Sequence, residues 1–90
     1  MDVKDAVKTA IHHINDLFES EGLSNLGLEE VEYDTLENQW VVTVGFSRPW
    51  DYPKSTLAAL AQSQPKRDFK IVRINVKGEV IEVKNRQSGE

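Results

Sequence analysis

Only two histidines, His12 and His13, offer an imidazole for acid–base or metal chemistry in this sequence. Asp16 and Glu19 follow His12 at spacings of four and seven, so one face of a helix would bring the three side chains toward one ion. The same spacing is typical of a solvated helix face, and a metal site needs three or four ligands held by further contacts. We therefore expect no metal site, no cofactor and no acid–base catalysis by His12.

An acidic run is the second candidate for chemistry, either as paired carboxylates or as a calcium site; it consists of Glu29, Glu30, Glu32, Asp34 and Glu37. Three of these residues alternate with Val31 and Tyr33, which sends their carboxylates to one side of a strand. The alternation favours a solvated, self-repelling edge that deters unwanted strand pairing.

The motifs of common enzyme classes are missing from this sequence. No G-x-G-x-x-G, G-x-x-x-x-G-K or G-x-S-x-G occurs, which excludes nucleotide binding through the first two and a nucleophile elbow. There is no cysteine, so thiolate ligands, disulfides and cysteine nucleophiles are excluded as well. We expect no catalytic residues and no enzyme.

The segment GFSRPWDYPKST, residues 45–56, interrupts an otherwise regular pattern. Its prolines stiffen the chain, and its arginine and aromatic side chains are of the kind enriched at protein interfaces. The candidate binding residues are Arg48, Trp50, Asp51 and Tyr52. The alternative is that Trp50 or Tyr52 plugs one end of a sheet, and the sequence leaves both interpretations open.

A helix over residues 3–18 must carry the two histidines. Asp2 is a plausible N-cap, and Gly22 is a stop signal beyond the last turn. The apolar residues recur at helical spacing and form one stripe: Val3, Val7, Ala10, Ile11, Ile14, Leu17 and Phe18.

Two β-hairpins account for most of the remaining chain. In the first, a four-residue loop TLEN places Tyr33 opposite Trp40 and Val31 opposite Val42, so that the large apolar residues share one face. In the second, a two-residue connection at Lys77 and Gly78 places Ile74 opposite Ile81 and Val72 opposite Val83, and all four would face the helix.

The fold class that follows is α+β in a single domain, residues 1–90. One N-terminal helix packs on a four-stranded antiparallel meander sheet, and a short helix over residues 57–61, capped by Ser55 or Thr56, lies in the connection between the hairpins. On the sheet face away from the helix, Val41, Ile71 and Val80 would lie close together and form a candidate self-association patch.

Composition and charge restrict the partners. The net charge is −4, which argues against nucleic-acid binding. Residues 1–47 hold 2 basic and 10 acidic residues, whereas residues 48–90 hold 9 basic and 5 acidic ones. Either the two halves pair within the fold, or a bipolar surface orients a partner. No apolar run is long enough to span a bilayer and no signal peptide precedes the helix, so we expect a cytoplasmic protein that does not enter membranes.

The order of elements resembles PepSY-like and gas-vesicle-protein-O-like small domains. The resemblance is carried by W-x-V-x-V at Trp40 to Val44 and by FKIVRINVKGEVIEV at residues 69–83, with Asn75 where an aspartate is common. It departs in RPWDYP, residues 48–53. It implies a helix on an antiparallel sheet, loosely cystatin-like in shape, and a non-enzymatic module with no catalytic residues.

The function expected from these observations is that of a small protein-interaction or regulatory module, acting on an unknown protein partner as a monomer or weak homodimer. The alternative is a domain that binds a small apolar molecule between helix and sheet, which a large pocket lined by Leu57, Leu60 and Trp50 would favour. A small enzyme is the third interpretation and would need a histidine beside a carboxylate in a cleft.

Overall fold

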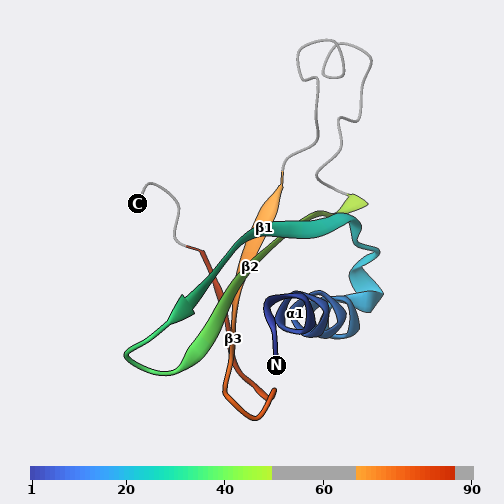
Figure 1. Ribbon diagram of the computed structural model, residues 1–90. Coiled ribbons are helices and arrows are strands. Elements are labelled where there is room, and N and C mark those ends of the chain that lie inside the picture. The colour runs from blue at the N-terminus through green and yellow to red at the C-terminus, as the bar shows by residue number, and fades with distance from the viewer. Residues whose placement is uncertain (50–66, 87–90) are drawn as a thin grey trace.

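The structure, a computed structural model, describes residues 1–49 and 67–86. One helix, α1 (Val3–Leu17), lies across one face of a four-stranded antiparallel sheet (Figure 1). The strands β1 (Ser24–Asp34), β2 (Gln39–Ser47), β3 (Asp68–Ile74) and β4 (Val80–Asn85) are ordered β1-β2-β3-β4. The predicted α+β meander is confirmed. The short helix predicted at residues 57–61 falls outside the described residues.

The ends of α1 follow the predicted signals. The Asp5 N–H donates to Asp2 Oδ1 at 2.9 Å, which satisfies one of the free donors of the first turn. After Leu17 a short 3-10 turn, η1 (Glu19–Glu21), leads to Gly22. Gly22 has a φ of 65°, a left-handed conformation that glycine adopts without strain, and it turns the chain into β1.

The core forms where α1 meets the centre of the sheet. Ala6, Ala10 and Ile14 are fully buried and repeat every four residues, so they form one row along the helix. Because alanine has a small side chain, this row lets α1 approach the sheet closely. The sheet supplies the other fully buried core residues, which are Val42, Val44 and Phe46 of β2 with Val72 and Ile74 of β3.

The first hairpin has the predicted register. Tyr33 pairs with Trp40 and Val31 with Val42 across the loop at residues 35–38. The two aromatic rings meet edge to face, with their centroids 5.0 Å apart. A register shift between Leu28 and Glu30 marks an irregularity in β1 at Glu29. Regular pairing therefore runs from Glu30 to the end of the strand.

The second hairpin differs from the prediction near its turn. The Asn75 N–H donates to the Glu79 carbonyl and the Gly78 N–H to the Asn75 carbonyl, which makes the loop three residues long instead of two. Gly78 has a φ of 82°, as expected for the glycine that ends such a loop. Ile74 consequently pairs with Val80, and a register shift at this point restores the predicted pairing of Val72 with Val83.

The extra loop residue reverses the faces of the sheet on which Val80 and Ile81 were predicted to lie. Val80 packs against the core cluster, whereas Ile81 is 49% exposed. The expectation that Ile81 faces the helix and Val80 faces away from it was therefore wrong. Asn75 explains the difference: its Oδ1 accepts from the Lys77 and Glu79 N–H groups and stabilises the longer loop.

Candidate functional site

The predicted binding segment is only partly described. Trp50, Asp51 and Tyr52 lie outside the described residues, so their roles stay predictions. Arg48 follows directly after β2, and its side chain is 13% exposed. It is therefore not the open cationic group that a recognition surface would need.

Arg48 instead joins three parts of the fold. Its Nε donates to Glu21 Oε1 in η1, and its Nη1 donates to Asp68 Oδ2 at the start of β3. Its guanidinium also lies 4.8 Å from the centroid of the Phe46 ring. Burial raises the pKa of Asp68, but the hydrogen bonds from Arg48 and from the Phe69 N–H outweigh this effect and lower it overall. This cluster is a structural clamp.

The three residues of the predicted self-association patch do not all lie on one face of the sheet. Val80 lies on the core side, and Val41 is only 9% exposed although it is on the outer face, the sheet face away from α1. Val41 pairs with Arg73, and Ile71 pairs with Thr43. Because residues two apart in a strand point to the same face, Val41 and Ile71 share the outer face. Self-association through Val41 and Ile71 stays a prediction.

Of the two acidic residues expected near His12, Asp16 contacts it. His12 Nε2 lies 3.3 Å from Asp16 Oδ2, and both side chains are mostly exposed. Within residues 1–49 and 67–86, no three histidine or carboxylate side chains are grouped to hold a metal ion.

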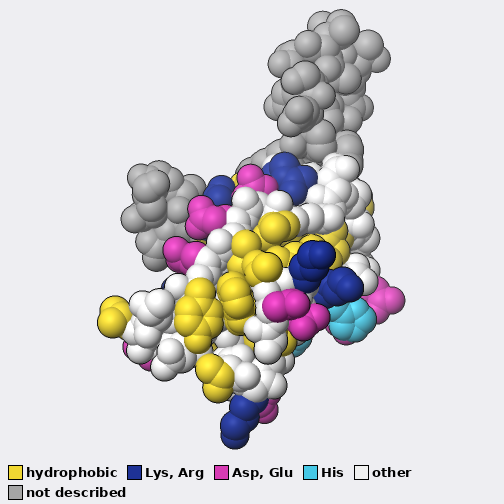
Figure 2. All heavy atoms as spheres, viewed as in Figure 1, with side chains coloured by type: hydrophobic (Ala, Val, Ile, Leu, Met, Phe, Trp, Pro, Cys, Tyr) yellow, Lys and Arg dark blue, Asp and Glu magenta, His cyan; other side chains and the backbone are white. Residues whose placement is uncertain are grey.

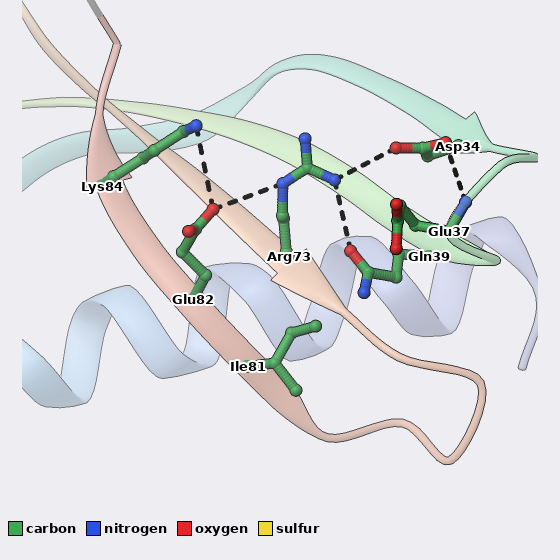
Figure 3. A pocket seen from close by; sticks show the side chains of 7 residues that line it. All are labelled: Asp34, Glu37, Gln39, Arg73, Ile81, Glu82 and Lys84. Atoms are coloured by element: carbon green, nitrogen blue, oxygen red, sulfur yellow. Dashed lines mark hydrogen bonds and ion pairs between the residues drawn. The ribbon is translucent and has the colours of Figure 1, made fainter.

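A polar hollow of about 540 Å³ lies on the outer face (Figure 3). Arg73 dominates it: Nη1 lies 3.2 Å from both Asp34 Oδ2 and Gln39 Oε1, and Nε lies 3.3 Å from Glu82 Oε1. One guanidinium thus ties together β1, β2 and β4 from its position on β3. Backbone hydrogen bonding from the Glu37 N–H lowers the pKa of Asp34 most, with help from Arg73.

The charged side chains of this hollow form ion pairs between strands. Arg73 is paired with carboxylates on both sides, and the Lys84 ammonium lies 3.8 Å from Glu82. The described residues that line the hollow carry no imidazole and no hydroxyl group; they are Asp34, Glu37, Gln39, Arg73, Ile81, Glu82 and Lys84. The ion pairs of the hollow therefore hold the strands together.

An apolar groove lies on the opposite side, between α1 and β1. Its volume is about 360 Å³, and it is lined by Val3, Val7, Leu28 and Val31 together with Lys4 and Lys8. Its lining surface is entirely apolar, so the two lysines contribute their aliphatic stems. Val3 of α1 is 43% exposed and Leu28 of β1 is 46% exposed. The groove between α1 and β1 is therefore open to solvent.

A second apolar hollow, of about 450 Å³, continues the groove beyond the N-terminal end of α1. It is lined by Met1, Tyr33, Trp40 and Val76. Val31 and Tyr33 point to the same side of β1 because they are two residues apart, and they connect the two hollows. Figure 2 shows hydrophobic side chains gathered on this face of the molecule.

We call these neighbouring hollows the apolar strip; it consists of Met1, Val3, Val7, Leu28, Val31, Tyr33, Trp40 and Val76. The sequence pattern included its helical members in a single core-facing stripe. In the structure, Ala10 and Ile14 of that stripe form a buried row with Ala6, which the stripe did not include, whereas Val3 and Val7 lie in a second, more exposed outward row. The spacing of four between Val3 and Val7 indicates that they share one row of the helix. The sequence did not indicate which row the sheet would cover.

The strip borders an open sheet edge. β1 pairs with β2 on one side, and no described residue pairs with its other side between residues 28 and 33. Glu30 and Glu32 alternate with Val31 and Tyr33, and both are exposed, as predicted for an acidic edge. The edge therefore has an apolar side toward α1 and an acidic side away from it.

No protein-family model, curated protein or solved structure matches this chain. The resemblance to PepSY-like and gas-vesicle-protein-O-like domains consequently stays a prediction from sequence. None of the helices in the described parts of the chain has the length and apolar character that crossing a bilayer requires.

Proposed function

We propose that this chain is a small protein-interaction module, acting without catalysis, and that it binds its partner on the apolar strip. The observation that carries the proposal is the exposure of large apolar side chains beside an open edge strand. The PepSY-like and gas-vesicle-protein-O-like resemblance supports the same class of function, and a cytoplasmic location remains part of the proposal.

Exposed apolar side chains are ordinary when they are scattered, but here they are grouped. Met1, Val3, Leu28, Tyr33 and Val76 are each between 41% and 67% exposed, and all five belong to the strip. Removing such apolar surface from water is the dominant favourable term in most protein–protein association. Aromatic side chains are also enriched at protein interfaces, and Tyr33 and Trp40 supply two.

The shape of the strip favours a protein over a small apolar molecule. Small-molecule pockets enclose most of the ligand surface and add a few polar groups that fix its orientation. The groove is open and its lining has no polar surface, so a small ligand there would remain largely in water. The residues expected to line a small-molecule pocket, Leu57, Leu60 and Trp50, fall outside the described residues.

The test compares two variants as bait in a lysate of the organism that encodes the chain. The double variant Val3→Ser with Leu28→Ser removes the centre of the groove. The control is Leu36→Ser, since Leu36 is the most exposed large apolar residue in the described chain, at 91%, and lies outside the strip. Circular dichroism should show that both variants keep the native fold, because none of the three residues belongs to the buried core.

Quantitative mass spectrometry should find proteins that wild type and Leu36→Ser retain and the double variant loses. Binding of the purified candidate must then show the same difference by calorimetry. Equal retention by all three baits would contradict the proposal. An apolar molecule that copurifies with wild type but not with the double variant, seen by native mass spectrometry, would favour the small-molecule alternative.

A further inference from the structure

We propose that the partner docks as an extended peptide that adds a fifth strand to the free edge of β1, with alternating apolar and basic side chains. This inference rests on the proposed function and specifies the partner's chemistry. Its basis is the two-sided character of the edge: an apolar groove on the α1 side and carboxylates on the other.

The backbone of β1 provides the first requirement for strand addition. An edge strand presents a row of N–H and C=O groups that can pair with another chain. Pairing of β1 with β2 is continuous from Glu30 to Asp34, so the free side of this stretch has regular strand geometry. A short extended peptide would find about five consecutive residues to pair with, and main-chain hydrogen bonds would supply affinity.

The groove side determines which residues the peptide places toward α1. Side chains on that side would lie beside Val31 and Tyr33 and against the outward row of the helix. The lysines at positions 4 and 8 also line the groove, so basic residues would meet like charges there. Apolar side chains therefore fit every second position of the peptide.

The other side determines the intervening residues. The carboxylates of Glu30 and Glu32 are exposed and lie on the face away from α1. A lysine or arginine directly opposite each of them on an added strand would form a favourable cross-strand pair. A strand with acidic residues at these positions would be repelled.

The same carboxylates disfavour a second copy of β1 as the occupant. Antiparallel pairing of two β1 strands would bring the acidic sides of both copies together, since they share one sheet face. A like-charged edge thus prevents self-pairing while it accepts a basic strand, and this combination gives the edge its selectivity.

The experiment uses the synthetic peptide Lys-Val-Lys-Val-Lys-Val-Lys, capped at both ends, with NMR titration of the labelled full chain. Three control peptides test separate parts of the inference. The first replaces lysine by glutamate, the second has the block order Lys-Lys-Lys-Lys-Val-Val-Val, and the third carries an N-methyl group on every residue, which removes the backbone donors on both sides of the peptide.

The alternating basic peptide should bind and shift the amide signals of residues 30–34, and the three controls should bind at least about tenfold more weakly. The variant Glu30→Gln with Glu32→Gln should weaken binding about fivefold at low salt, because two cross-strand charge pairs are lost. The matched control Glu19→Gln removes an exposed carboxylate distant from the edge and should leave binding unchanged.

Equal binding of the acidic or N-methylated peptide, or signal shifts confined to the outer face, would overturn strand addition. Absence of peptide binding would do the same. If the strip variants still lose a protein partner in the bait experiment, the proposed function survives that result. A concentration-dependent dimer that Glu30→Gln with Glu32→Gln strengthens would identify a second copy as the occupant and likewise overturn the inference.

Discussion

Arg48 Nη1 lies 2.7 Å from Asp68 Oδ2, although the two residues are 20 positions apart in the chain. The contact joins the residue after β2 to the first residue of β3. Together with the bond from Arg48 to Glu21, it fixes the end of the sheet against the turn that follows α1. An arginine that the sequence suggested for partner binding thus holds the fold together.

Replacing this arginine should reduce stability. Arg48→Ala removes both hydrogen-bonded ion pairs and the contact with the Phe46 ring, so we expect a loss of about 1–3 kcal/mol in the free energy of unfolding. Partial exposure of both carboxylates limits the effect, because water replaces some of the lost bonds. Urea denaturation measures the loss of stability. The control is Lys84→Ala, because the Lys84 side chain is 53% exposed; it should change the free energy of unfolding by less than about 0.5 kcal/mol. A loss equal to that of the control would show that Arg48 is not a clamp.

Acidification should destabilise the protein through Asp68 and Asp34. The pKa of each is lowered from the ordinary value of 3.8 in the folded chain. Their stabilising effect is therefore fully present above about pH 4 and is lost as the pH falls through the lower, folded values. Thermal melts between pH 2 and pH 7 should show a decline confined to the acid end.

The variant Asp68→Asn distinguishes the contribution of Asp68 to acid destabilisation from that of Asp34. This variant should be less stable than wild type at neutral pH and should lose less stability on acidification. An acid decline as steep as that of wild type would mean that the Arg48–Asp68 pair does not contribute to it.

Gly45 is required by close packing on the outer face. A Cβ atom at this position would lie 2.6 Å from Arg67 Nη2 and 3.1 Å from the Phe69 ring. Gly45→Val should therefore cost about 1–3 kcal/mol through overpacking. Gly27 is the matched control because it pairs with Gly45 on β1 and has no atom within 4 Å of an added Cβ. Equal unfolding midpoints for Gly45→Val and Gly27→Val would refute the packing argument.

The register of the second hairpin predicts unequal effects for two neighbours. Val80→Ala removes methyl groups that contact the core and should cost about 1 kcal/mol, on the scale of small deletions in partly buried positions. Ile81→Ala should cost less than about 0.5 kcal/mol, because Ile81 is half exposed. Chemical denaturation of both variants decides the point, and a larger loss for Ile81→Ala would support the two-residue turn instead.

The sequence by itself was enough to predict α1, the four antiparallel strands and the register of the first hairpin, because these depend on local information. The cap at Asp2 and the apolar spacing of residues 3–18 predict α1 within one residue of its observed end. A four-residue loop and matching alternation on both sides of it leave only one register that places Tyr33 and Trp40 on the same face. The acidic edge at Glu30 and Glu32 follows from the same alternation.

Tertiary structure decided everything that depends on partners distant in the chain. Arg48 reaches residues 27 and 20 positions away, and no local pattern identifies such contacts. Val80 and Ile81 exchanged sides because the side chain of Asn75 stabilised one extra loop residue, and strand alternation converts a shift of one residue into a change of face. The exposure of Val3 and Leu28 follows from where α1 lies on the sheet, and that position is set by the close packing of Ala6 and Ala10 against β2 and β3.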